Sequence, residues 1–287
     1  MVKYCAEAKL PAHRQLQYMP PAGGKDVLPS GEGRFVLMKK EYRLPVFAAV
    51  LGLAGFVLRL AENQLFDPLT GLPADSALHW LLPLFLLAAA AFLVLLTRRE
   101  AFVPAEFEEA YPFAGKGAVV CIVLGAALLL VAAVLQFFSF LLLNEVVLGI
   151  LGILMLLTAA GLFVVLRDCR KGLTSRSYLL LPGLCLMALL LVAGYRAEVT
   201  NSVLLSFYVQ VLAQAALLLQ YYYLPAAAYA PEKSRPCALF AALSALLCLT
   251  AAADGGKLVG GIFYLSQGLL SLGILLGRRT APAEETK

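Results

Sequence analysis

The sequence carries unusually little charge. Only 14% of its 287 residues are charged, against about 25% in an average soluble domain. Hydrophobic residues make up 61% of the chain, and its mean hydropathy is +0.84. This composition excludes an ordinary water-soluble protein and predicts a protein of the lipid bilayer.

The sequence is also poor in the residues that build metal and catalytic sites. It has two histidines, His13 and His79, and its six cysteines form no Cys-x-x-Cys pair. It lacks a His-Glu-x-x-His zinc motif, a glycine loop ending in Gly-Lys-Ser/Thr and a Gly-x-Ser-x-Gly elbow. We therefore predict no catalytic residue, no metal site and no cofactor, and we predict that the protein is not an enzyme.

Long apolar segments dominate what is present. Eight of them are found, covering residues 44–62, 78–97, 117–142, 146–166, 178–195, 203–224, 236–253 and 258–277. Each approaches the roughly 20 residues that a helix needs to cross about 30 Å of hydrocarbon, and none alternates like a barrel strand. We predict an all-α, polytopic transmembrane bundle of eight helices, with a transmembrane domain over 44–277 and no separate soluble domain.

The distribution of basic residues predicts the orientation. Of the 23 Lys and Arg residues, all but Arg59, Arg196 and Lys257 lie in the two ends of the chain or near the connections after even-numbered segments. Cytoplasmic loops are enriched in Lys and Arg, so both termini are predicted to be cytoplasmic, including a tail over 278–287. The net charge of +5 is then an orientation signal, and no nucleic-acid partner is expected.

The first 43 residues are predicted to form a disordered cytoplasmic tail, because proline, glycine and scattered charge occur there without apolar periodicity. We also hypothesise that residues 1–37 result from a start-site error, since Met38-Lys39-Lys40 is a natural beginning shortly before the first apolar segment. The alternative is a genuine flexible tail.

Two arginines at the outer ends of helices suggest a polar site. Arg59 and Glu62 are three residues apart, so they share a helix face inside the first segment. Arg196 and Glu198 stand in a similar layout after the fifth segment, which suggests that the chain consists of two parallel halves. One interpretation is that both arginines bind a carboxylate or phosphate. The other is that each extends to the lipid headgroups and pairs locally.

The sixth segment contributes two amides at helical spacing, Gln210 and Gln214. They are predicted either to line a polar pathway for a substrate or to form hydrogen bonds between helices. Gly273 and Gly277 form a small-xxx-small pair in the last segment, which suggests close packing or a dimer contact.

The chain resembles a group of uncharacterised small multi-pass membrane proteins of anaerobic Gram-positive bacteria of the Clostridia type. The similarity covers residues 38–277 and depends on Phe66-Asp67-Pro68-Leu69-Thr70-Gly71-Leu72 and on Tyr195-Arg196 followed by Val203-Leu204-Leu205 and Tyr208. The chain departs from the group at Asn201-Ser202, where the pattern has Asp-Pro. The resemblance implies a bacterial cytoplasmic membrane and no known activity.

From these observations we predict a transport or permease-like protein that binds a small solute or lipid. Its substrate-binding residues would be Arg59, Glu62, Arg196, Glu198, Gln210 and Gln214. The alternative is a sensor or membrane subunit that acts through contact with another membrane protein or with a second copy. A transporter predicts a water-accessible cavity that reaches Gln210 or Gln214, whereas a subunit predicts a dry, tightly packed core.

Overall fold

The computed structural model describes residues 42–64, 78–99, 110–113, 115–171, 176–198, 207–254 and 258–278. The chain divides into two units, Met1–Leu37 and Met38–Lys287, and all described residues belong to the second. The predictions for the N-terminal tail and for most of the C-terminal tail lie outside the described residues. Within the described part every regular element is helical, and no strand occurs.

Eight long helices make up this part of the chain. Two are preceded by a short 3₁₀ turn, at Ser177–Leu180 and Pro231–Lys233. The long helices are α1 (Arg43–Asn63), α2 (Leu78–Arg99), α4 (Lys116–Leu143), α5 (Val146–Arg170), α6 (Leu181–Glu198), α7 (Tyr208–Tyr229), α8 (Ser234–Ala251) and α9 (Leu258–Gly277). They correspond one to one with the predicted segments.

Seven of the eight helices are long and apolar enough to cross a membrane, and α7 is not among these seven. The length and composition of these helices are those of an integral membrane protein. The orientation of the chain in the membrane stays a prediction. Helix α7 is less apolar because it carries three glutamines, Gln210, Gln214 and Gln220. The helix begins later than the predicted 203–224. It also ends later, because Pro225 is accommodated inside the helix.

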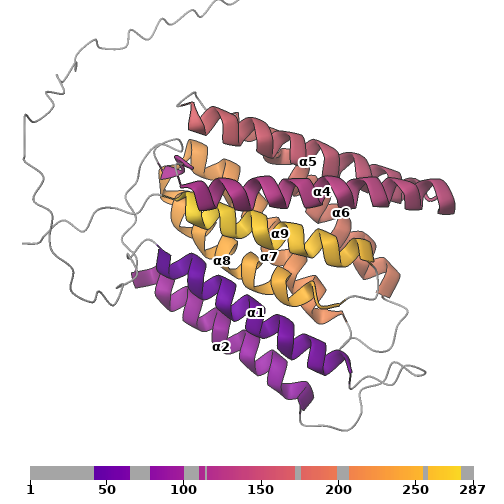
Figure 1. The fold of residues 1–287 in the computed structure, drawn as a ribbon, viewed down its shortest axis with the longest axis horizontal. Helices are drawn as coiled ribbons and strands as arrows, with labels where there is room; N and C mark the ends of the chain where they lie inside the picture. Colours follow the sequence, from indigo (N-terminus) through magenta and orange to yellow (C-terminus); the bar gives the residue numbers. More distant parts are fainter. Residues whose placement is uncertain are drawn as a thin grey trace, which may run out of the picture. The chain divides into compact units, whose positions relative to one another are not determined.

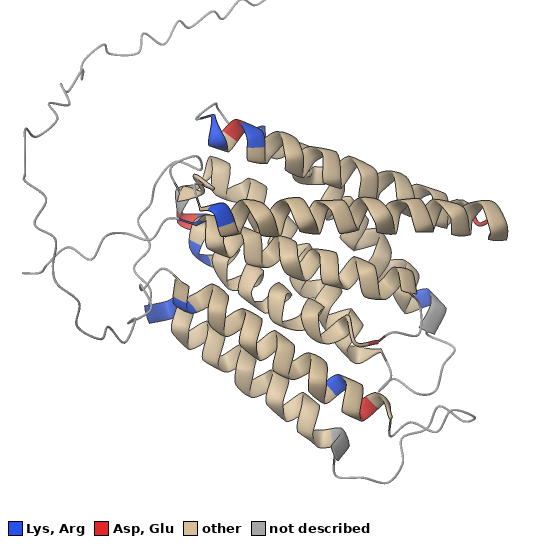
Figure 2. Ribbon diagram, viewed as in Figure 1, with Lys and Arg blue, Asp and Glu red and all other residues tan. Residues whose placement is uncertain are grey.

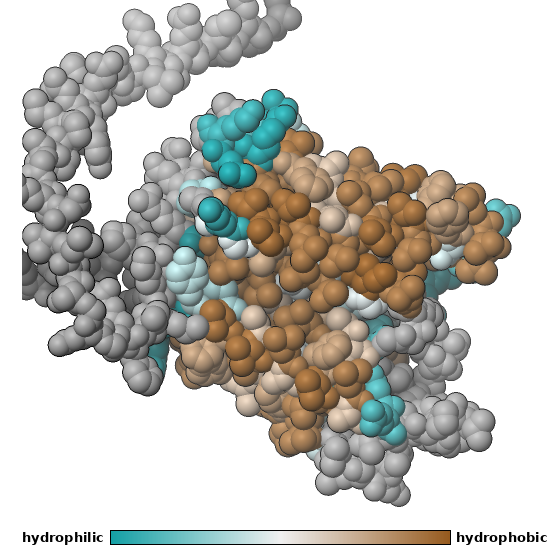
Figure 3. All heavy atoms as spheres, viewed as in Figure 1, coloured by the Kyte–Doolittle hydropathy of each residue, from teal (hydrophilic) through white to brown (hydrophobic). Residues whose placement is uncertain are grey.

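Helices α8 and α9 lie in the middle of the bundle. Helix α8 packs against α1, α7 and α9, and α9 packs most extensively against α4. The hairpin formed by α1 and α2 lies on one side of this central pair, and the hairpin formed by α4 and α5 lies on the other (Figure 1). The outer helices present broad apolar surfaces, as expected for lipid contact (Figure 3).

Small residues let α1 approach α8 closely. A Cβ atom added at Gly52 would come within 2.7 Å of Leu249 Cδ1, and one added at Gly55 would collide with Thr250. Together with Ala48 these glycines form one buried stripe of α1. Close approach through small residues is a common way to pack helices in lipid, where apolar side chains gain little by leaving the bilayer.

A short segment before α4 inserts into the bundle. Tyr111 and Phe113 are both buried, although they lie outside the long helices. Phe113 has a φ of 45°, a strained backbone conformation for a bulky residue, and it packs against Gly277 at the end of α9. Gly273 packs against Ile122 of α4, so this small-xxx-small pair is used for packing within the chain.

Candidate functional site

The buried stripe of α1 continues beyond its small residues into two charged ones. Ala48, Gly52 and Gly55 are followed at helical spacing by Arg59 and Glu62, which are only 1% and 2% exposed. Because the small residues bring α1 against α8, the next side chains on the same stripe enter the interface between the two helices. The sequence therefore directs two ionisable groups into the bundle.

Arg59 is held by two carboxylates. Its Nη1 lies 2.6 Å from Glu62 Oε2, three residues further along the same helix. Its Nε lies 2.5 Å from Oδ1 of Asp254, which follows the last turn of α8 and is 8% exposed. The three side chains form a buried ion cluster that joins the end of α1 to the end of α8.

Neighbouring polar groups extend this cluster to α7. Asn63 Nδ2 donates to the Ala253 carbonyl oxygen at 3.1 Å, and Gln210 Nε2 donates to Asp254 Oδ2 at 3.3 Å. The Arg59 guanidinium carbon lies 5.5 Å from the centre of the Tyr208 ring, within the range of a cation–π contact. We call Arg59, Glu62, Asn63, Tyr208, Gln210 and Asp254 the outer polar cluster, a name that follows the orientation predicted from the sequence.

Charged groups dominate the outer polar cluster. The Arg59 guanidinium contacts both the Glu62 and the Asp254 carboxylates. An ionised group in hydrocarbon is costly unless it is paired and hydrogen-bonded. Removal of the arginine would take from both carboxylates a cation that they contact, so the stability of the three groups is linked.

The structure brings together only some of the predicted site residues. Arg59, Glu62 and Gln210 meet in the outer polar cluster, whereas Arg196 is exposed near the end of α6. Helix α6 packs mainly against α5 and α7, while α1 packs against α2, α8 and α9, so the two arginines stand in different surroundings. The side chain of Glu198 lies outside the described residues. The packing thus does not repeat the sequence layout shared by Arg59 and Arg196.

Gln214 belongs to a row of hydrogen bonds between α7 and α9. Its Nε2 donates to the Tyr264 hydroxyl at 2.9 Å. Further along the same two helices, the Tyr221 hydroxyl donates to Gln267 Oε1 at 3.0 Å, and Ser271 Oγ donates to Gln220 Oε1 at 2.8 Å. These contacts match the predicted role of hydrogen bonding between helices, and we call them the α7–α9 polar ladder.

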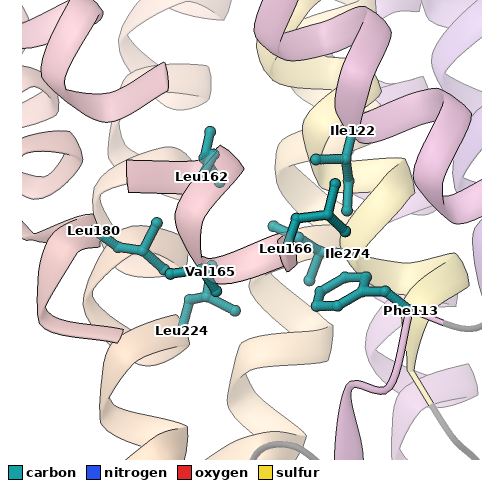
Figure 4. Close-up of a pocket in the computed structure, with 8 residues that line it drawn as sticks. All are labelled: Phe113, Ile122, Leu162, Val165, Leu166, Leu180, Leu224 and Ile274. Carbon is teal, nitrogen blue, oxygen red and sulfur yellow. The ribbon is translucent and has the colours of Figure 1, made fainter. Parts of the chain in front are cut away.

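A small apolar cavity lies elsewhere in the bundle, near the inserted segment. Its volume is about 20 Å³, enough for about one water molecule. Only apolar side chains line it, and they come from α4, α5, α7, α9, the 3₁₀ turn before α6 and the segment before α4 (Figure 4). Neither Gln210 nor Gln214 lines this cavity, and its apolar walls offer a water no hydrogen-bond partner.

Three members of the outer polar cluster, Asn63, Tyr208 and Asp254, are not among the site residues predicted from the sequence. A signal was available for Asp254, because a carboxylate at the end of an apolar segment is a natural partner for a buried arginine. Among the described residues, no group of three or more His, Cys, Asp or Glu side chains has the arrangement of a metal site.

Comparison of the chain with models of protein families, with curated proteins and with solved structures gives no match.

Proposed function

We propose that this integral membrane protein is a subunit or sensor that acts through contact with another membrane protein. The observation that carries the proposal is the α7–α9 polar ladder. Gln214, Gln220 and Tyr221 each use a polar atom in a hydrogen bond to α9. A solute pathway along α7 would need those atoms to face water, whereas a packed scaffold needs them to join helices.

A second observation supports contact with a partner. Helix α4 has 28 residues and so is about 42 Å long at 1.5 Å per residue, clearly more than the roughly 30 Å of hydrocarbon. Together with α5 it extends past α9 at one end of the bundle (Figure 1). The tip is apolar, and Leu142 there is 84% exposed. A neighbouring membrane protein that packs on this tip would cover it.

Transport of a small solute is the second candidate. It is favoured by the outer polar cluster, because ionisable residues inside membrane segments often mark the pathways of protons, ions or charged substrates. In this alternative the polar ladder would open during the transport cycle, and Gln210 and Gln214 would become accessible to water.

Accessibility of introduced cysteines separates the two candidates. The six native cysteines are first replaced by alanine, and Gln214→Cys or Ser271→Cys is then introduced singly. Membrane vesicles that contain each variant are treated with a charged thiol reagent on both sides. We expect neither to react, since both positions are buried. The positive control is Glu145→Cys, which lies exposed between α4 and α5. Rapid labelling of either buried position would overturn the proposal in favour of transport.

Photo-crosslinking in cells tests the contact itself. A photoreactive amino acid replaces Leu142 at the tip of α4 or Leu87 in α2, which is 71% exposed within a shorter helix. We expect a discrete protein adduct from Leu142 and only lipid adducts from Leu87. An adduct of twice the mass of the chain would identify the partner as a second copy. Equal lipid adducts from both positions would contradict contact at the tip.

A further inference from the structure

A groove runs between α2 and α8 on the outside of the bundle. Its volume is about 450 Å³, and it is lined by Val94, Thr97 and Arg98 from α2 and by Arg235, Pro236 and Leu239 from α8. This volume lies within the range of small-ligand sites, which is about 300–1,000 Å³. The groove is separate from both the outer polar cluster and the α7–α9 polar ladder.

The groove has an apolar part and a cationic part. Val94, Pro236 and Leu239 provide apolar lining, while Arg98 and Arg235 are exposed and provide two guanidinium groups. Among the described residues that line the groove, none is acidic. Arg235 Nη2 donates to the backbone carbonyl of Arg98 at 2.5 Å, which holds the two helix ends together beside the groove. The positive end of the α8 helix dipole also lies here, since the helix begins at Ser234.

The position of the groove places its arginines near a membrane surface. Arg98 and Arg99 end α2, and Arg235 lies in the first turn of α8. The Lys and Arg residues of the described helices gather mainly at this end of the bundle (Figure 2). Arg59 instead contacts Asp254, beyond the opposite end of α8. Arginines at the end of a membrane helix lie at the level of the lipid phosphates, next to the hydrocarbon that begins one or two turns further in.

We propose that this groove binds an anionic phospholipid. The headgroup phosphate lies between Arg98 and Arg235, whose guanidinium groups match phosphate oxygens in geometry and charge. One acyl chain follows Val94 and Leu239 toward the middle of the bilayer. Inorganic phosphate would leave the apolar half of the groove unfilled, and a zwitterionic lipid would bring its own cation close to the arginines. Basic pockets between membrane helices are known sites for anionic headgroups.

Native mass spectrometry of the purified full-length chain tests the proposal. Phosphatidylglycerol and phosphatidylcholine with the same acyl chains are titrated in turn, and retained lipid is counted. We expect phosphatidylglycerol to be retained selectively. Arg98→Gln, which removes one guanidinium, and Leu239→Trp, which fills the apolar part, should each weaken its retention about tenfold. The matched control is Arg99→Gln, an exposed neighbour that does not line the groove and should retain the lipid.

Several outcomes would overturn the phospholipid site. One is equal retention of the two lipids, which would mean that the arginines select no headgroup charge. Another is unchanged retention in both Arg98→Gln and Leu239→Trp. Displacement of the lipid by excess inorganic phosphate would show that the apolar part contributes nothing. Cross-linking of Leu239 to a protein instead of a lipid would assign the groove to a protein partner. Thermal unfolding of each variant distinguishes lost binding from lost folding.

Discussion

Arg59 near the C-terminal end of α1 and Asp254 beyond the end of α8 form a buried ion pair, although 195 residues separate them in the chain. The pair fixes the C-terminal end of α1 to the C-terminal end of α8, a central helix of the bundle. Glu62 binds the same guanidinium from the other side, at 2.6 Å from Nη1. Both carboxylates therefore contact the same cation, so the loss of Arg59 disturbs two buried ion pairs at once.

The first prediction concerns this arginine. Arg59→Gln removes a cation that both Glu62 and Asp254 contact, and breaking a buried ion pair by removing one partner typically costs about 3–5 kcal/mol of unfolding free energy. We expect a large fall in the midpoint of unfolding when the detergent-solubilised protein is titrated with a denaturing detergent. The matched control is Arg196→Gln on the exposed surface of α6, which should change stability by about 0.5 kcal/mol or less.

A compensating variant shows whether unpaired charge causes the loss of stability in Arg59→Gln. If uncompensated carboxylates cause the loss, the triple variant Arg59→Gln with Glu62→Gln and Asp254→Asn should recover most of the stability. Equal instability of the single and triple variants would contradict the electrostatic explanation and would leave only lost packing.

The second prediction concerns the approach of α1 to α8. A Cβ atom at Gly55 would collide with Thr250, so Gly55→Ala forces the two helices apart. Overpacking of this kind costs about 1–3 kcal/mol, even though alanine is the better helix former. The control is Gly117→Ala in α4, where a Cβ atom meets nothing within 4 Å. Unfolding should show a loss for Gly55→Ala and none for Gly117→Ala; equal stabilities would contradict the close packing.

The third prediction concerns the α7–α9 polar ladder. Tyr221 donates to Gln267 across the interface, and hydrogen bonds between membrane helices are worth about 0.6 kcal/mol on average and at most about 1.7. A double-mutant cycle of Tyr221→Phe and Gln267→Leu should give a coupling energy in this range. Ser139→Ala serves as the control partner, because Ser139 donates only within its own helix, to Leu135. If the coupling energy between Tyr221 and Gln267 were as small as that between Tyr221 and Ser139, the result would contradict the α7–α9 polar ladder.

The fourth prediction concerns Tyr111, which lies outside the long helices and is fully buried. Burial raises the pKa of its phenol well above the usual value, and the nearby Cys237 thiol raises it further. The folded state therefore keeps this proton at a pH where the unfolded state has lost it. The contribution to stability is present below about pH 10 and is lost as the pH rises above it.

Thermal unfolding between about pH 9 and pH 11 measures this contribution. The unfolding temperature of the unaltered chain should fall more steeply than that of Tyr111→Phe, which has no proton to lose and otherwise fills the same space. The other tyrosines titrate in both proteins, so the difference between the two slopes belongs to Tyr111. Parallel slopes would contradict a buried, neutral phenol at this position.

The helices were predictable because each apolar segment carries its own signal. The last helix begins and ends as predicted, at Leu258 and Gly277, and the first differs from its predicted range by one residue at each end. Helix α7 shows where this signal weakens, because its glutamines lower its hydropathy and Pro225 does not end it. The pairing of Arg59 with Glu62 was also local, since three residues along a helix return a side chain to the same face.

The sequence by itself determined a membrane-embedded, all-helical chain and the presence of a charged pair in its first segment. Only the tertiary structure decided that Asp254 completes this pair, that Gln214 faces Tyr264, and that Arg196 stays exposed. The physical reason is that these helices are apolar on nearly every side, so no amphipathic stripe shows which face meets which neighbour. In lipid the choice depends on small residues such as Gly55 and on a few hydrogen bonds between helices, and both become visible only once the helices are packed.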